Sequence, residues 1–266
     1  MNQESLSVGP TPVLQSPQPS PTIRSQIRPS TPVLFRGAIK NWKFLVKFLL
    51  FSLAFWLLEF FYQYKGLVNG QLGIALIRSF ALAGATYIGV ALLTSSIFKF
   101  RPRLSRYWHL RRALGVMGFV FILFHVLSVI FVIDGGNLGG SVYSFNPLEN
   151  PIIFGILAFP IFFVMAITST DWAVAKLGYT RWKNIHRLVY LGYLSAVFHF
   201  LLVNPPLLKN IAGYLLLATT FIALAGELYW FLKIAKKNNF RTRETLVGIL
   251  IILLYLALGY LAFFYK

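Results

Sequence analysis

Three of the four histidines in this 266-residue chain lie inside strongly apolar stretches: His125, His186 and His199. A histidine is costly to bury in a hydrophobic span, because its ring nitrogens need hydrogen-bond or metal partners there. The type and placement of these residues predict a buried metal or cofactor site. The alternative at each position is a packed core histidine that is hydrogen-bonded to a neighbouring carbonyl group.

The chain contains no cysteine. That absence excludes disulfides, thiolate metal sites, iron–sulfur clusters, cysteine nucleophiles and the covalent attachment of c-type haem. A haem would therefore have to be held non-covalently. The sequence also lacks a glycine-rich strand–turn–helix pattern for a dinucleotide and lacks a P-loop, so we expect no nicotinamide-binding domain in this chain.

The composition is that of an integral membrane protein. Hydrophobic residues make up 57% of the chain and charged residues 12%, and the mean hydropathy is +0.68. A soluble domain carries about 25% charged residues. The net charge of +18 does not indicate nucleic-acid binding, because Lys and Arg form short clusters between apolar runs, as membrane topology signals do.

Seven apolar runs each approach the roughly 20 residues that a membrane-spanning helix needs. They cover residues 43–64, 72–98, 113–133, 151–168, 185–203, 210–232 and 246–264. We therefore predict an all-α integral membrane helical bundle. Its parts would be a disordered Pro-rich cytoplasmic tail at 1–40, a six-helix core at 41–233, and a basic loop with a seventh C-terminal span at 234–266.

The basic residues predict how these spans are oriented. If successive connections alternate between the two sides of the membrane, 21 Lys and Arg residues lie on one side and three on the other, with Arg78 inside a span. The positive-inside rule then predicts a cytoplasmic N-terminus and a C-terminus outside. The acidic, glycine-containing loop at 134–150 is expected on the outer face.

Two histidines are predicted to lie at the same depth. His125 is 13 residues beyond Arg112, and His199 is 13 residues beyond His186, which is about 20 Å along each helix. Both helices should run from inside to outside. Two imidazoles facing each other across a bundle are what axial ligation of b-type haem requires.

His186 is less constrained by the sequence, because 13 residues turn an ideal helix by roughly 220° and place it on a different face from His199. It could ligate a second haem, exchange with His199, or line a site where electrons enter. The fourth histidine, His109, lies in a basic loop and is expected to be solvated.

Charged residues near the spans have structural and functional interpretations. Glu59 and Arg78 should lie at similar depth, so an ion pair between them is expected; alternatively, Arg78 neutralises a haem propionate. Arg112 belongs to a basic rim at the inner end that could meet propionates, a quinone head group or an anionic flavin. The other members of that rim are Arg111, Arg181, Lys183 and Arg187.

Two stretches carry a family resemblance: RRALGVMGFVFILFHVLSV at 111–129 and AITSTDWAVAKLGYTRWKNIHRLVYLGYLSAVFHF at 166–200. They contain an RRxLG turn, a third-span histidine, a TST element, a W-x-x-x-H sequence and a second fifth-span histidine. In these features the chain resembles the ferric reductase-like transmembrane family over about residues 43–232. It is similar in particular to haem-binding membrane subunits of methionine sulfoxide repair systems.

The resemblance implies that the first six spans form a haem core in the bacterial inner membrane. It implies one or two b-type haems, with His125 and His199 as axial ligands and His186 as a further haem- or transfer-related residue. Electrons would come from a cytoplasmic flavin reductase or the quinone pool, by way of FMN or a quinone, and reach a periplasmic molybdopterin enzyme.

In that interpretation the chain is an electron-transfer subunit, and catalysis takes place in its partner. Two other functions remain open from the sequence. One is a metal-reducing core that works with a separate flavoprotein. The other is a non-redox transporter or scaffold whose histidines are structural.

Overall fold

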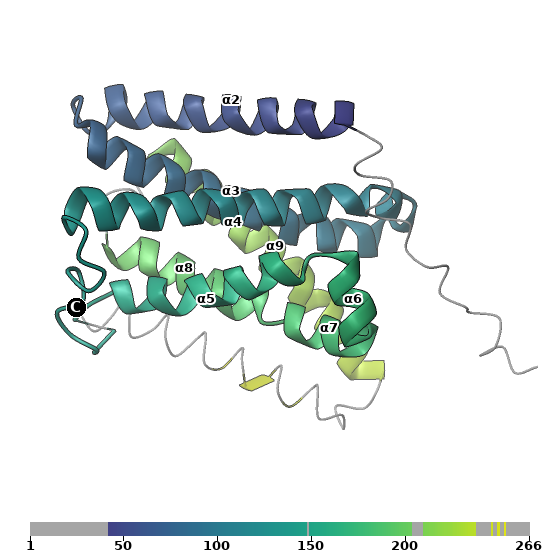
Figure 1. Ribbon diagram of the computed structural model, residues 1–266. Coiled ribbons are helices and arrows are strands. Elements are labelled where there is room, and N and C mark those ends of the chain that lie inside the picture. The colour runs from purple at the N-terminus through teal and green to yellow at the C-terminus, as the bar shows by residue number, and fades with distance from the viewer. Residues whose placement is uncertain are drawn as a thin grey trace, which may run out of the picture. The chain divides into compact units, whose positions relative to one another are not determined.

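The computed structural model describes residues 42–147, 149–203 and 210–237, and isolated positions at 246, 249, 250 and 253. All regular elements in that part of the chain are helical (Figure 1). In order they are α2 (Trp42–Gly66), α3 (Leu72–Phe100), η2 (Pro102–Tyr107), α4 (Trp108–Ser128), η3 (Val129–Ile133), α5 (Ile152–Thr168), α6 (Asp171–Leu177), α7 (Tyr179–His186), α8 (Val189–Val203) and α9 (Ile211–Lys237).

Within the described residues, five helical segments are long and apolar enough to cross a membrane. They are Trp42–Gly66, Leu72–Phe100, Pro102–Ile133, Tyr179–Val203 and Ile211–Lys233. The pair α5 and α6, bent by 94°, adds a sixth if it forms one span. The predicted all-α membrane bundle is confirmed. The predicted tail lies outside the described residues, and so does nearly all of the seventh span.

Helices α3 and α4 approach each other closely through two glycines. A Cβ atom on Gly84 would lie 2.7 Å from Ile122, and one on Gly118 would lie 2.7 Å from Ile88. Small residues at such crossings let the backbones of membrane helices touch, where van der Waals packing replaces the hydrophobic effect as the main attraction. Figure 1 shows α3 crossing behind α4, and the two helices are in extensive contact.

Helices α5 and α8 form a second close pair. A Cβ atom on Gly192 of α8 would lie 2.8 Å from Ile161 of α5. The two helix pairs meet in a buried cluster that also includes α9. Its members are Ile88, Leu92, Ala158, Phe162, Tyr193, Val197 and Ala223. The Tyr193 hydroxyl lies 3.0 Å from that of Thr220, so this buried polar group has a partner.

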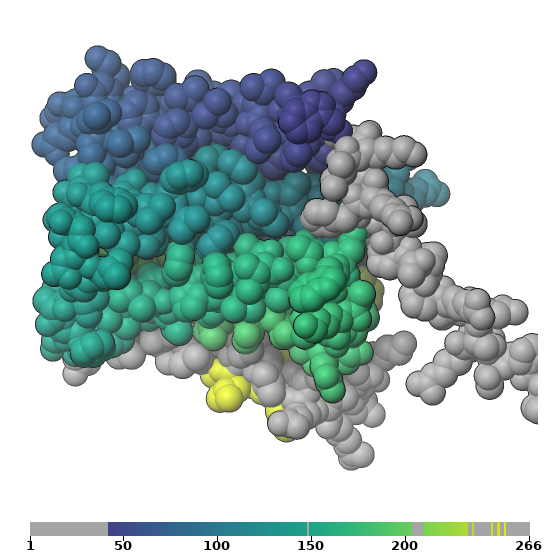
Figure 2. Space-filling view, viewed as in Figure 1, coloured from purple at the N-terminus to yellow at the C-terminus, as the bar shows by residue number. Residues whose placement is uncertain are grey.

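Helix α2 lies at the edge of the bundle. It packs on α3, and the Ser52 hydroxyl accepts a hydrogen bond from the Tyr87 hydroxyl at 3.0 Å. Most of its length is exposed, as the space-filling view shows (Figure 2). A helix that is apolar and exposed in this way suits contact with lipid.

The predicted span at 185–203 lies within the helical segment Tyr179–Val203, but a two-residue turn at 187–188 interrupts the helix between His186 and His199. Helix α7 ends at His186, a turn follows, and α8 begins at Val189. Gly178 separates α6 from α7 with φ +74°, a conformation that side chains with a Cβ rarely adopt. Helices α6 and α7 therefore fold across the end of the bundle that is opposite the 134–150 loop (Figure 1).

Candidate functional site

The structure brings His125 and His199 together. Their rings come from α4 and α8, and the ring centroids are 6.3 Å apart with the planes inclined at 63°. A metal ion bonded to one nitrogen of each of two imidazoles, at roughly 2 Å per bond, needs centroids roughly 6 Å apart. We refer to His125 and His199 as the histidine pair.

Each ring of the histidine pair is oriented by a backbone carbonyl group. Nδ1 of His125 lies 3.0 Å from the Ile77 oxygen, and Nδ1 of His199 lies 3.1 Å from the Pro151 oxygen. A carbonyl oxygen can only accept, so Nδ1 carries the proton in both rings and Nε2 keeps its lone pair. Metal-ligating histidines are held in this way by their second nitrogen.

The close helix pairs explain this placement. His125 follows Gly118 by two helical turns, and Ile77 precedes Gly84 by two turns on the antiparallel α3. The close approach of α3 and α4 therefore brings the His125 ring within hydrogen-bonding distance of the Ile77 carbonyl. His199 likewise follows Gly192 by two turns, and its Nδ1 lies 3.2 Å from where a Cβ on Gly155 would be.

The donor set of the histidine pair fits haem better than a bare metal ion. Among the described residues, no three His, Cys, Asp or Glu side chains form a metal-binding group. Structural zinc sites take four protein ligands. Two imidazoles suffice for a haem iron, because the macrocycle supplies the remaining nitrogen ligands.

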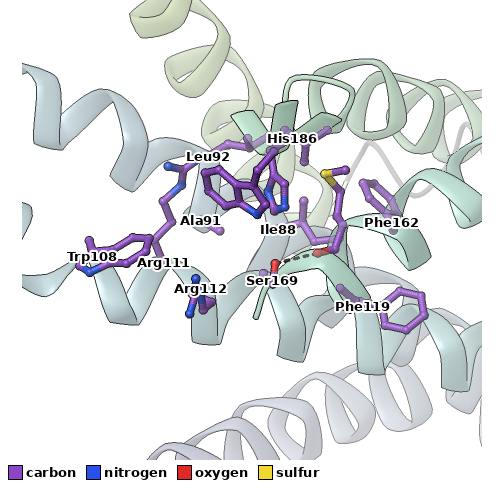
Figure 3. Close-up of a pocket in the computed structure, with 15 residues that line it drawn as sticks. Ile88, Ala91, Leu92, Trp108, Arg111, Arg112, Phe119, Phe162, Ser169 and His186 are labelled. Carbon is purple, nitrogen blue, oxygen red and sulfur yellow. Dashed lines mark hydrogen bonds between the residues drawn. The ribbon is translucent and has the colours of Figure 1, made fainter. Parts of the chain in front are cut away.

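A second site lies at the other end of the bundle, in a cavity of about 90 Å³ (Figure 3). Its polar and aromatic lining comes from α4, α5, the α5–α6 bend and α7. It comprises Trp108, Arg111, Arg112, Phe119, Phe162, Ser169, Trp182 and His186. We call this cavity the basic pocket. Figure 3 shows the two arginines on one side of it and His186 on another.

His186 contacts a side-chain hydroxyl group. Its Nε2 lies 3.0 Å from the Thr168 hydroxyl, which donates to the Val164 carbonyl at 2.6 Å. The Thr168 oxygen is thus left to accept from His186, so Nε2 carries the proton and Nδ1 keeps its lone pair. Trp182 packs against the ring, with the centroids 4.1 Å apart and the planes inclined at 32°, and it donates from Nε1 to the Thr168 carbonyl at 2.9 Å.

Arg112 forms an ion pair with Asp171 at 2.8 Å, with the two side chains 12% and 20% exposed. Asp171 opens α6 just after Thr170, whose hydroxyl accepts from the Ala173 amide and caps the helix. The ion pair joins α4 to the sharp bend between α5 and α6. Arg112 therefore has a structural partner as well as a place in the pocket wall.

The expected ion pair between Glu59 and Arg78 is wrong. Glu59 accepts a hydrogen bond from Gln63 at 2.8 Å, one turn along α2. The two ion pairs within the described residues are Arg112–Asp171 and Lys99–Glu227. Arg78 is half-buried on α3, directly after Ile77. His109 is exposed in the first turn of α4, edge-on to Phe44.

Several residues that shape the two sites carried no assigned role in the sequence. Thr168 and Trp182 belong to the TST and W-x-x-x-H elements, so their motif was visible but their joint contact with His186 was not. Asp171 follows the TST element directly. The carbonyl groups of Ile77 and Pro151 have no sequence signal, because every residue has a carbonyl.

The comparisons with known proteins agree with this architecture. Residues 70–197 match the family model of the ferric reductase like transmembrane component. The resemblance predicted from the sequence is confirmed, and the match covers α3 through most of α8. It includes His125 and His186 and stops two residues before His199.

The chain is also similar to curated bacterial proteins named protein-methionine-sulfoxide reductase heme-binding subunit MsrQ. It is 34% identical to the Agrobacterium fabrum protein over 117 residues, which are 44% of this chain and 52% of that protein. It is 31% identical to the Brucella ovis and Brucella suis proteins over 140 residues, which are 50% of this chain and 61% of each relative.

The chain therefore spans about half to three-fifths of the length of these curated relatives. No solved structure matches it.

Proposed function

We propose that this chain transfers electrons across a bacterial inner membrane through haem b held by His125 and His199. The observation that carries the proposal is the histidine pair itself: two rings 6.3 Å apart, each with Nδ1 committed to a carbonyl and Nε2 left for a metal. The relatives named as heme-binding subunits support the same cofactor.

The haem would supply a one-electron redox centre, and the protein residues would hold and tune it. The carbonyl groups of Ile77 and Pro151 fix the ring orientations and increase the donor strength of the ligands. The apolar helices around the pair exclude water. Arg78 follows Ile77 on α3, and we propose that its guanidinium neutralises a haem propionate.

The basic pocket is proposed as the place where electrons enter. It offers two arginines, two tryptophan rings and the lone pair on Nδ1 of His186, which suits a planar redox carrier with an anionic or carbonyl-bearing group. FMN and a quinone both have that chemistry. A second haem is disfavoured, because Nε2 of His186 is bonded to Thr168 and the pocket has no other histidine.

The proposal includes a direction of electron transfer and a partner on each side of the membrane. The basic residues favour a cytoplasmic basic pocket, so a flavin reductase or quinol would donate there. The histidine pair lies near the opposite face, beside the 134–150 loop. The acceptor would be a periplasmic molybdopterin methionine sulfoxide reductase of the MsrP type, and catalysis would take place in that partner.

The test uses the full chain in liposomes loaded with ferricyanide, with dithionite added outside. The expected result is a Soret band that shifts on reduction, and reduction of trapped ferricyanide well above the rate of empty liposomes. His125→Ala should abolish both the band and the extra rate. His109→Ala, at an exposed histidine, serves as the matched control and should keep both.

The same liposomes distinguish the proposed function from the two alternatives. A non-redox transporter or scaffold would show no Soret band and no extra rate, and that result would overturn the proposal. A metal-reducing core would reduce ferric chelates on the outer side faster than it reduces a molybdopterin methionine sulfoxide reductase. That preference would overturn the proposed acceptor while leaving the haem site in place.

A further inference from the structure

Asn150 lies where the 134–150 loop joins α5, and its side chain is completely buried. Both ends of its amide group are bonded: Nδ2 donates to the Ser141 carbonyl at 3.1 Å, and Oδ1 accepts from the Ile152 amide at 3.2 Å. A buried amide with its donor and acceptor both satisfied is expensive to disturb. The side chain therefore fixes the loop to the first turn of α5.

The backbone of Asn150 is held as firmly as its side chain. Its amide donates to the Asn146 carbonyl at 2.8 Å, and its carbonyl accepts from the Ile153 amide at 3.1 Å. Asn150 and Ile152 are thus anchored on either side of Pro151, whose ring restricts its own φ. The direction of the Pro151 carbonyl is set by these anchors.

The Pro151 carbonyl has two donors. It accepts from the Phe154 amide at 3.1 Å, inside the first turn of α5, and from Nδ1 of His199 at 3.1 Å. The His199 ring also packs against the α5 backbone, because a Cβ on Gly155 would lie only 3.2 Å from Nδ1. A shift of this first turn would move the ring with it.

His125 is held differently. Its carbonyl partner, Ile77, lies inside the long helix α3, where the helix itself fixes the direction of the carbonyl. Of the two rings, only that of His199 depends on a loop junction. Asn150 is the side chain that organises this junction.

We infer that Asn150 is a positioning residue for His199: by fixing the Pro151 carbonyl, it holds the His199 ring in the orientation and tautomer needed to ligate the haem iron. This inference rests on the proposed function. The hydrogen bond to Nδ1 makes the imidazole a stronger donor, which stabilises the ferric state. Loosening the junction should therefore raise the reduction potential of the haem.

The experiment compares the full chain with Asn150→Ala, Asn150→Ser and Asn137→Ala. Serine keeps an oxygen that can accept from the Ile152 amide. Asn137 is an exposed asparagine of the same loop, whose side chain accepts from the Gly139 amide, and it serves as the matched control. The measurements are haem content, reduction potential, and the low-spin ferric EPR signal, which reports on axial ligand orientation.

Asn150→Ala should keep its haem but disfavour the ferric state by about tenfold, which for one electron is a shift of about 59 mV to higher potential. Its EPR signal should change as well. Asn150→Ser should lie between Asn150→Ala and the unaltered chain, and Asn137→Ala should match the unaltered chain. If Asn150→Ala fails to assemble, the intermediate potential and signal of Asn150→Ser support the inference.

An unchanged potential and EPR signal in either haem-loaded Asn150 variant would overturn the inference. An equal shift in Asn137→Ala would overturn it too, since the effect would then belong to the loop in general. Failure of the proposed function looks different: the unaltered chain would hold no haem, or His199→Ala would retain it with the same spectrum.

Discussion

The histidine pair and the basic pocket are built on opposite tautomers. In the pair, Nδ1 of each ring donates to a backbone carbonyl and Nε2 keeps the lone pair. In the pocket, Nε2 of His186 donates to the Thr168 hydroxyl and Nδ1 keeps the lone pair. The difference arises from the partner each ring meets.

The residues that surround the two sites differ as well. Each ring of the histidine pair faces the other imidazole among apolar helices. His186 instead faces arginines and packs against Trp182. Two opposed lone pairs suit a metal. One lone pair beside two cations suits a diffusible ligand with its own acceptor and donor groups. Three histidines in two spans therefore need not share one function.

The greatest loss of stability should come from breaking the ion pair behind the basic pocket. Asp171→Asn leaves the Arg112 guanidinium, 12% exposed, without its carboxylate partner. Removing one member of this half-buried pair should cost about 2 kcal/mol of unfolding free energy, between the values for exposed and buried pairs. Unfolding by titration with SDS measures this.

The matched variant is Lys99→Met, which removes the partner of Glu227. The Lys99 side chain is 39% exposed, so the loss should be about 1 kcal/mol or less. Equal losses of unfolding free energy in the two variants would show that the Arg112–Asp171 pair stabilises the protein no more than an exposed ion pair does.

A smaller and local effect is expected at the histidine pair. Gly155→Ala places a Cβ 3.2 Å from Nδ1 of His199 and should push the ring from its carbonyl. We expect haem affinity to fall about tenfold, the lower end of the range for losing a supporting contact. Haem titration measures it.

Gly66→Ala is the control for that substitution, since its Cβ would meet nothing closer than Tyr62 at 3.9 Å. Undiminished affinity in Gly155→Ala would contradict the assignment of His199 as a ligand held by α5.

Removing the partner of His186 should have a modest effect on stability. Thr168→Val keeps the shape of the side chain but deletes the hydroxyl that accepts from Nε2–H, at a cost of about 1 kcal/mol. Thr219→Val, where the hydroxyl donates only to the Leu215 carbonyl of its own helix, is the control.

Nitrogen NMR of the imidazole should show His186 protonated at Nε2 in the unaltered chain and a mixture of tautomers in Thr168→Val. A ring protonated at Nδ1 in the unaltered chain would remove the contrast between the two sites.

The smallest expected effect is on the 134–150 loop. Hydrogen bonds from Ser144 and Asn146 hold the pKa of Glu149 below its usual range. The contribution of this carboxylate to loop order is therefore complete above the usual glutamate pKa of about 4.3, and it is lost as the pH falls through the lowered value.

Amide exchange near Glu149, corrected for the intrinsic rate, should accelerate on acidification through that range. Glu149→Gln should remove the pH dependence. An identical acceleration in Glu149→Gln would assign the effect to another group.

Much of the membrane architecture could be predicted from the sequence, because apolar length and the periodic placement of basic clusters report directly on spans. The meeting of His125 and His199 could also be anticipated, since both lie 13 residues along parallel-running helices. Their role as ligands remains a prediction. Depth can be read from residue counts because a helix rises by a constant distance per residue.

What could not be predicted depends on rotation about the helix axes and on backbone partners. Glu59 and Arg78 lie at similar depths, but depth does not fix the direction in which a side chain points. Gln63, one turn from Glu59, takes the carboxylate instead. The break after His186 has no proline or glycine to mark it, so an uninterrupted helix was the natural expectation.

The most direct test of the central claim is a count of haem per chain by pyridine haemochrome in the full chain and in three variants. The two-site interpretation predicts one haem per chain, lost in His125→Ala and in His199→Ala and retained in His186→Ala. Two haems per chain, with one lost in His186→Ala, would contradict it and make the basic pocket a second haem site.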